Sequence, residues 1–441
     1  MKTIKGIPVA TALVLAACGF DVTNPGPVPD EVLDDPGAYA SIVRGVQFNL
    51  SRAVSIDAYY GAVAAKEYST SGRVIATKLP LAFGQLTVDD MAGGAGTWNW
   101  SHSARWQAEN GVERLRRVLG ADFATNRFAG QLLMYAALSN RVLGENMCEA
   151  VIDGGPAQPN TVHLTRAETL ATEAIDVATA ANDVATANAA RAVRASVRLY
   201  LGKFAEAAID AAAVPTSFVL SAPFDEQLRN IIVESNDFML SGSTGFRAHT
   251  VWRTFFENYY RTTGDPRTQW DSLTSPATAR FGEFTNILWD FQRKYTAYGS
   301  AIRLASGREM RLVEAEVALR NNDVTTAMTL INGIRTAVNS RFNGQPLQPW
   351  TASTVPEAWD ALKRERSIEL WLEARTMGDL RRWIADGTYP SMFTIGPEND
   401  VANRIRLCLP ITRGERQTNP NLSRTPNDPT NPIFDGSVAP W

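Results

Sequence analysis

The acidic side chains of one late segment are spaced as catalytic groups often are. In ALKRERSIELWLEARTMGDLRRW, residues 361–383, Glu365, Glu369 and Glu373 recur at four-residue steps, which places them on one face of a helix. Grouped carboxylates can serve as general acid and general base. Like charges at this spacing also repel each other by about 0.2 to 0.5 kcal/mol per pair, so cations must lie close to them.

The same segment supplies candidate cations. Its candidate partners for the glutamates are Arg366, Arg375, Arg381 and Arg382, and Asp379 is a further acid. A turn at Gly378 allows DLRRW to fold back onto the glutamates. Because arginine keeps a nearby carboxylate ionised and lowers its value as a proton donor, we interpret these eight charged residues as a structural ion network, with catalysis as the alternative.

No recognised catalytic or metal-binding motif accompanies these acids. The three histidines, His102, His163 and His249, are far apart and do not form HExxH, and the chain contains neither a GxSxG elbow nor a P-loop. Its formal net charge is −3, which argues against nucleic acid as a partner. We therefore expect no metal, no cofactor and no nucleic acid.

The N-terminus predicts export. Two lysines precede an apolar run over residues 7–17, which is too short to span a bilayer. The run ends in LVLAACGF and resembles a bacterial lipobox, so we expect a signal peptide over 1–17, lipid on Cys18 and a flexible tether over 18–36. An ordinary secretory leader without lipid is the alternative.

Two cysteines remain beyond the lipobox. They are Cys148 and Cys408, and an even number of cysteines in an oxidising compartment favours a disulfide. Two separate buried thiols are the alternative, since the sequence alone does not bring the two side chains together.

Helical periodicity dominates the chain. Apolar residues recur at three- and four-residue steps over about 104–213 and again over about 306–383, in pairs with small residues and tight corners such as Gly-Lys-Phe. These hairpins are similar to tetratricopeptide units, but their period is imperfect. Between them lies an irregular region, about 215–305, and residues 386–441 are too rich in proline for continuous helix. We expect a mainly α fold with few short strands.

The order of the motifs resembles the SusD/RagB family of outer-membrane nutrient-uptake lipoproteins. Residues 361–383 are similar to the family's late helix, LPITRGERQTNPNL to its closing segment, and residues 312–335 to its third helical unit. The resemblance implies one SusD-like domain over 37–441. It also implies a lipid-anchored protein facing the cell exterior that captures a nutrient, commonly an oligosaccharide, as the lid of a TonB-dependent, SusC-like β-barrel transporter.

Aromatic side chains in loops are the candidates for holding a sugar, because an aromatic face packs against the apolar side of a sugar ring. Trp98 and Trp100 follow the glycine-rich MAGGAG and are expected in a loop. Tyr59, Tyr60 and Trp270 are further candidates. The competing hypothesis is a lipid-anchored glycoside hydrolase, which needs two carboxyl groups at a set separation.

Overall fold

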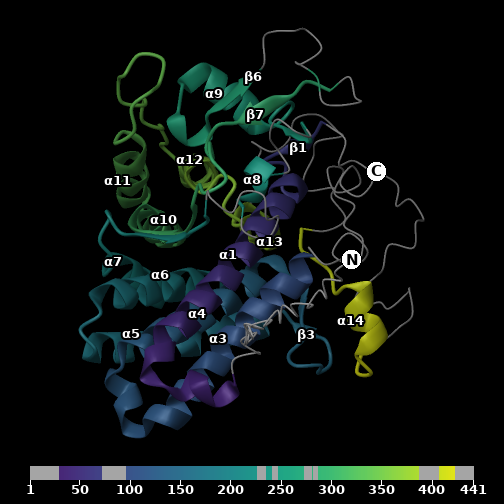
Figure 1. Ribbon diagram of the computed structural model, residues 1–441. Coiled ribbons are helices and arrows are strands. Elements are labelled where there is room, and N and C mark those ends of the chain that lie inside the picture. Colours follow the sequence, from purple (N-terminus) through teal and green to yellow (C-terminus); the bar gives the residue numbers. More distant parts are fainter. Residues whose placement is uncertain are drawn as a thin grey trace, which may run out of the picture.

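The structure is a computed structural model that describes residues 29–71, 96–225, 235–240, 247–272, 281, 287–386 and 407–422. Helices dominate these residues, and the strands are short and paired two by two (Figure 1). The prediction of a mainly α fold with helical hairpins and few strands is confirmed. The predicted signal peptide, Cys18 and the MAGGAG segment lie outside the described residues.

The first half of the chain is a stack of helices, each packed on the one before it. In order they are α1 (Tyr39–Ala64), α3 (Thr97–Leu119), α4 (Arg127–Asn146), α5 (Thr161–Ala180), α6 (Val184–Tyr200) and α7 (Phe204–Ala212). Close approach between α4 and α5 depends on Gly144, where a Cβ atom would lie only 2.6 Å from the Leu164 side chain.

A second helical group follows the irregular region. It consists of α10 (Gly307–Arg320), α11 (Val324–Arg335), α12 (Val355–Glu369) and α13 (Thr376–Ala385). Helix α10 packs against α7 and α6 and so joins the two groups. The hairpin corners repeat: Asp183 and Asp323 accept hydrogen bonds as N-caps of α6 and α11, each directly after an asparagine at positive φ, at 56° and 60°.

Short strands tie the irregular region to the helices. Strand β4 (Val219–Ala222) follows α7 and pairs antiparallel with β8 (Ile302–Ser306), which leads directly into α10. The other antiparallel pairs are β1 (Ser69–Thr70) with β5 (His249–Thr250), β2 (Glu149–Ala150) with β3 (Gln158–Pro159), and β6 (Trp270–Ser272) with β7 (Asp290–Gln292).

Several short helices complete the described chain. They are η1 (Asp30–Asp34), η2 (Pro36–Ala38), η3 (Gly120–Thr125), α8 (Asp237–Leu240), α9 (Phe255–Thr263), η4 (Pro266–Thr268) and α14 (Arg413–Thr418). Within the described ranges no helix is both long and apolar enough to cross a membrane.

The last part of the predicted tether is attached to the helical stack. Residues 30–38 form η1 and η2, and Asp34 pairs with Arg114 and Arg117 of α3 at 2.6 and 2.9 Å. Asp30 also pairs with Arg114. The prediction of a free tether as far as residue 36 is therefore wrong for its final residues, because two arginines on one helix face neutralise the aspartates.

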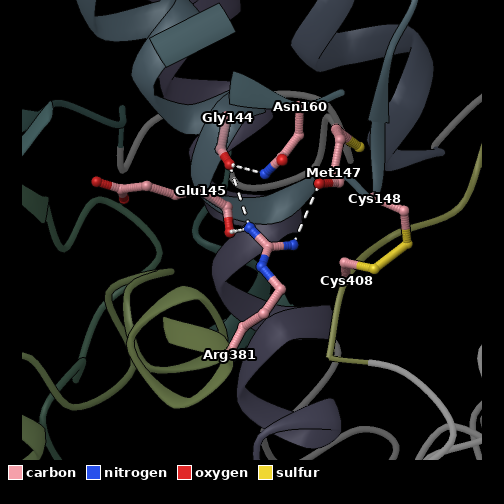
Figure 2. Close-up of a disulfide and its surroundings, with 7 residues drawn as sticks. All are labelled: Gly144, Glu145, Met147, Cys148, Asn160, Arg381 and Cys408. Carbon is pink, nitrogen blue, oxygen red and sulfur yellow. Dashed lines mark hydrogen bonds between the residues drawn. A yellow bond between two sulfur atoms is a disulfide. The ribbon is translucent and has the colours of Figure 1, made fainter. Parts of the chain in front are cut away.

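The closing segment of the chain lies along the end of α4 (Figure 2). The Cys148 N–H donates to the Leu409 carbonyl at 2.9 Å, and the Leu409 N–H donates to the Asn146 carbonyl at 2.7 Å. A disulfide joins Cys148 to Cys408, with their Cα atoms 4.9 Å apart and 260 positions between them in sequence. The C-terminal segment is thus held covalently as well as by backbone hydrogen bonds.

Replacing both Cys148 and Cys408 by Ser should lower the free energy of unfolding by about 2 to 4 kcal/mol, because the unfolded chain regains the freedom that the closed loop removes. Urea unfolding followed by circular dichroism measures the loss. Treating the native protein with reductant should produce the same loss, and leave the double variant unaffected. Equal stability of the wild type, the reduced wild type and the double variant would contradict a stabilising disulfide.

Candidate ligand-binding site

The stacked carboxylates of α12 are buried. Glu365 is 0 % and Glu369 is 1 % exposed. Three arginines surround the Glu369 carboxylate: its Oε2 lies 2.9 Å from Arg267 Nη1, and its Oε1 lies 2.7 Å from Arg303 Nη1 and 3.0 Å from Arg308 Nε. These arginines come from η4, β8 and α10, so the Glu369 carboxylate joins α12 to η4 and to the continuous β8–α10 segment.

The neighbouring glutamates have similar partners. Arg267 also pairs with Glu365 at 2.6 Å, and Lys294 pairs with Glu373 at 2.6 Å. The other Glu365 oxygen accepts a hydrogen bond from the Trp350 indole at 2.9 Å. We call Glu365, Glu369 and Glu373, with their cations, the glutamate cluster.

The arginines that follow the glutamates form a second group of pairs. Arg366 Nε lies 2.7 Å from Asp379, Arg375 lies 2.9 Å from Glu145 and 2.7 Å from Glu309, and Arg382 lies 2.5 Å from Glu316 and 2.9 Å from Asp379. The expected pairing of these arginines with the three stacked glutamates is therefore wrong. These arginines and the stacked glutamates contact different parts of the protein. Arg375 pairs with Glu145 of α4 and Glu309 of α10, and Arg366 also lies near Glu309.

Arg381 has a different role. It donates hydrogen bonds to the carbonyls of Gly144, Glu145 and Met147 at 3.2, 3.0 and 3.2 Å, as Figure 2 shows. These carbonyls end α4 and have no partner within the helix. Arg381 therefore caps α4 beside the disulfide.

The carboxyl groups of Glu369 and Asp379 have lowered pKa values and are held ionised. Burial by itself raises the pKa of Glu369, but Arg303, Arg267 and Arg308 outweigh burial and keep that pKa below its usual range. Burial also raises the pKa of Asp379, but Arg366 and Arg382 outweigh burial and lower that pKa to about 2. A carboxyl group that stays ionised is a poor proton donor, so the arrangement supports structure and not acid catalysis.

Glu369→Gln should lower the free energy of unfolding by about 3 to 5 kcal/mol, because three buried or half-buried arginines lose their shared anion. Urea unfolding at neutral pH measures the effect. Glu113→Gln is the matched control, since Glu113 is 74 % exposed and lies 3.9 Å from Arg116, and it should change stability little. Equal stability of the two variants would contradict the structural role.

The glutamate cluster fixes a group of aromatic side chains. Arg267, bound to Glu365 and Glu369, lies between α9 and β6. Helix α9 ends at Gly264, whose φ is 66° and where a Cβ atom would lie 2.5 Å from Ser340 Oγ. The turn that carries residues 340–344 therefore packs directly against the end of α9.

Three aromatic rings meet at this place, and we call Tyr260, Trp270 and Phe342 the aromatic triad. The Tyr260 ring lies 6.1 Å from Trp270 and 5.4 Å from Phe342. Phe342 is 58 % exposed, and the other two are half-buried. The Trp270 indole donates to the Glu257 carbonyl at 3.0 Å, which fixes the plane of its ring.

Polar groups border the triad. The Arg261 guanidinium lies 5.4 Å from the centre of the Trp270 ring and pairs with Glu257. Burial raises the pKa of Tyr260, Arg341 opposes this rise and Asp271 adds to it, so both charges lie near the Tyr260 hydroxyl. Aromatic faces beside charged and polar groups can hold a sugar ring by its apolar side and by its hydroxyls.

The structure separates the five aromatic residues that the sequence singled out. Trp98 and Trp100 lie in α3, so their predicted loop placement is wrong. Trp98 is 3 % exposed and packs 4.2 Å from the His102 ring, and Tyr59 is 1 % exposed and bonded to His249. Trp100 and Tyr60 are partly buried against the same core.

Only Trp270 of those five lies in the triad, whereas sequence reasoning missed Tyr260 and Phe342. Tyr260 is one of many aromatic residues in the irregular region, and Phe342 lies in an RFNG turn outside that region. The one signal in the sequence was the position of Phe342 in a turn-like stretch, because a phenylalanine that packs in the core is expected in a periodic element.

A buried acid between α1 and α3 gives the protein a pH dependence. Asp57 is 0 % exposed, and its Oδ2 accepts from Ser101 Oγ at 2.8 Å, while its Oδ1 has no hydrogen-bond partner in the part of the chain that the structure describes. Burial raises the pKa of Asp57 to about 8, and the Ser101 hydrogen bond opposes the rise.

Asp57→Asn should flatten the dependence of stability on pH. The folded protein retains a proton that the unfolded chain releases above about pH 4, so the wild type should lose stability as the pH rises from there to about 8. Urea unfolding at pH 5 and pH 8 measures the slope, with the exposed Asp176→Asn as control. A slope that is the same in wild type and Asp57→Asn would contradict this interpretation.

Among the residues with described positions, no group of three or more His, Cys, Asp or Glu side chains is arranged to hold a metal ion. The site is thus defined by aromatic and charged side chains and by the helical scaffold beneath them.

Comparisons with known proteins agree with this scaffold. The SusD family model matches residues 292–427, which include the glutamate cluster except Arg267. No curated protein matches the sequence. Among solved structures, a SusD superfamily protein of Bacteroides vulgatus ATCC 8482 has 14 % identity and a TM-score of 0.60, over 88 % of this chain and 98 % of that one.

Two further structures share the fold. A SusD/RagB family protein of Bacteroides thetaiotaomicron VPI-5482 has 12 % identity and a TM-score of 0.63, over 86 % of this chain and 94 % of that one. A laminarin-binding SusD-like protein has 14 % identity and a TM-score of 0.63, over 89 % of this chain and 100 % of that one. The protein has the SusD-like helical fold.

Proposed function

We propose that this protein is a cell-surface lipoprotein that binds glycans and passes them to a TonB-dependent transporter as its lid. The observation that carries the proposal is the aromatic triad, which is open to solvent at Phe342 and whose Trp270 follows closely after Arg267, the residue that ties this stretch to Glu365 and Glu369. One protein with the same fold binds laminarin. The anchor at Cys18 and the SusC-like partner rest on the family resemblance.

Rigid aromatic platforms suit the capture of glycans. A sugar ring presents apolar C–H groups on its faces and hydroxyls around its edge, so it gains from a flat aromatic surface with polar groups at the border. Because the Trp270 ring is held by its indole hydrogen bond, little side-chain freedom is lost on binding. The proposal does not include hydrolysis of the glycan, since the Glu369 carboxylate is surrounded by arginines.

Trp270→Ala and Phe342→Ala should each weaken glycan binding about fivefold, which corresponds to about 1 kcal/mol of aromatic contact. Affinity electrophoresis in gels containing laminarin, and then soluble glucans, mannans, xylans and pectins, measures the change. Trp106→Ala is the matched control, because Trp106 is a tryptophan of α3 that is 54 % exposed, and it should bind as the wild type does.

Thermal unfolding of each variant separates a lost contact from a lost fold. Equal retardation of wild type, Trp270→Ala and Phe342→Ala would remove the triad from the site. A wild-type protein that binds none of these polysaccharides would contradict the proposed function, and release of reducing ends from a bound polysaccharide would favour a hydrolase.

A further inference from the structure

A cavity of about 360 Å³ lies between α1, α4, α6 and β4. Helices α4 and α6 lie away from α9 and β6, which carry two members of the aromatic triad (Figure 1). The wall of the cavity is largely apolar and includes Val43, Met134, Ala189 and Leu220. Sites of this size commonly hold a small molecule. The proposed glycan site makes no use of this cavity.

A tyrosine whose hydroxyl has no hydrogen-bond partner in the described ranges lines the cavity. Tyr135 is 7 % exposed and borders the cavity, and its hydroxyl makes no hydrogen bond to any residue in the described ranges. Burial raises the pKa of Tyr135, so the hydroxyl stays protonated and available as a donor. Other buried tyrosines differ: Tyr259 donates to Asp265 at 2.7 Å, and Tyr295 donates to the Leu372 carbonyl at 2.9 Å.

Two arginines stand at the rim of the same cavity. Arg44 and Arg127 both line it and are exposed, and neither makes an ion pair within the described chain. Arg127 only stacks on the Phe128 ring, at 4.9 Å.

No acidic side chain is among the described residues that line the cavity. The carboxylate of Asp183 is bonded to two lining residues, accepting from Thr186 N at 3.1 Å, Thr186 Oγ1 at 2.8 Å and Gln131 Nε2 at 3.3 Å. The rim therefore carries two arginines, the wall is largely apolar and the Tyr135 hydroxyl is available as a donor. An anion with an apolar body complements all three features.

We propose that this cavity binds a small amphipathic carboxylate. The carboxylate lies between Arg44 and Arg127, the apolar body fills the space against Met134 and Leu220, and a hydroxyl at the far end of the ligand meets Tyr135. The proposal is independent of glycan binding, because no residue of the aromatic triad contributes to the cavity.

Three naphthalene compounds test each part of the proposal by isothermal titration calorimetry on the full chain. The compound 6-hydroxy-2-naphthoate carries the carboxylate and the distal hydroxyl, 2-naphthoate lacks the hydroxyl, and 6-hydroxy-2-naphthamide replaces the charge by an uncharged group of the same shape. We expect 6-hydroxy-2-naphthoate to bind with one site per chain, 2-naphthoate to bind less tightly, and the amide to bind least.

Variants locate the site. Arg44→Gln and Arg127→Gln should each weaken 6-hydroxy-2-naphthoate binding about tenfold, because each removes a charge-assisted hydrogen bond. Arg191→Gln, on α6 but outside the cavity, is the matched control. Ala185→Trp places a large side chain at the exposed edge of the cavity and should abolish binding without disturbing the core.

Tyr135→Phe provides a second, independent measurement. Because the hydroxyl has no partner in the fold, its removal should leave thermal stability unchanged, and it should erase the preference for 6-hydroxy-2-naphthoate over 2-naphthoate. Absence of saturable binding at millimolar concentration, equal binding of the amide, or unchanged binding in Arg44→Gln, Arg127→Gln and Ala185→Trp would each overturn the proposal.

Discussion

Glu365 and Glu369 of α12, with Glu373 just beyond its end, can be buried only if cations from other segments neutralise them, because an unpaired buried charge costs several kcal/mol. The structure meets this requirement with Arg267 of η4, with Lys294, and with Arg303 and Arg308 of the adjoining β8 and α10. Each of those places is thereby fixed relative to α12. The irregular region owes its position to this cluster more than to its own secondary structure, since its strands are only two to five residues long.

A second set of buried pairs extends the same constraint into the first half of the chain. Arg375 joins Glu145 at the end of α4 to Glu309 at the start of α10, and Arg381 caps the α4 carbonyls next to the disulfide. The α12 to α13 segment therefore lies between the helical stack and the irregular region and bonds to both. A loop surface supported in this way can present an aromatic platform with little freedom of movement, which suits capture of a ligand from solution.

The aromatic triad and the cavity in the helical stack differ in chemistry. The triad is open and combines ring faces with charges of both signs, whereas the cavity is partly open, largely apolar and bordered by Arg44 and Arg127, with no acid among its described lining residues. The triad suits the proposed neutral glycan, and the cavity suits the proposed small anion. The two proposed ligands would not compete.

The sequence by itself determined the helical hairpins, the grouping of opposite charges near residue 365 and the paucity of strands, because helix periodicity and like-charge spacing are local properties. It also supplied Trp270, one of the three aromatic residues of the proposed site. Only the tertiary structure decided that Trp98 and Tyr59 lie in the core, that Tyr260 and Phe342 join Trp270, and which cation meets which glutamate. Those outcomes depend on which distant segments pack together, and a ring or a carboxylate has the same local pattern whether its neighbour is solvent or another part of the chain.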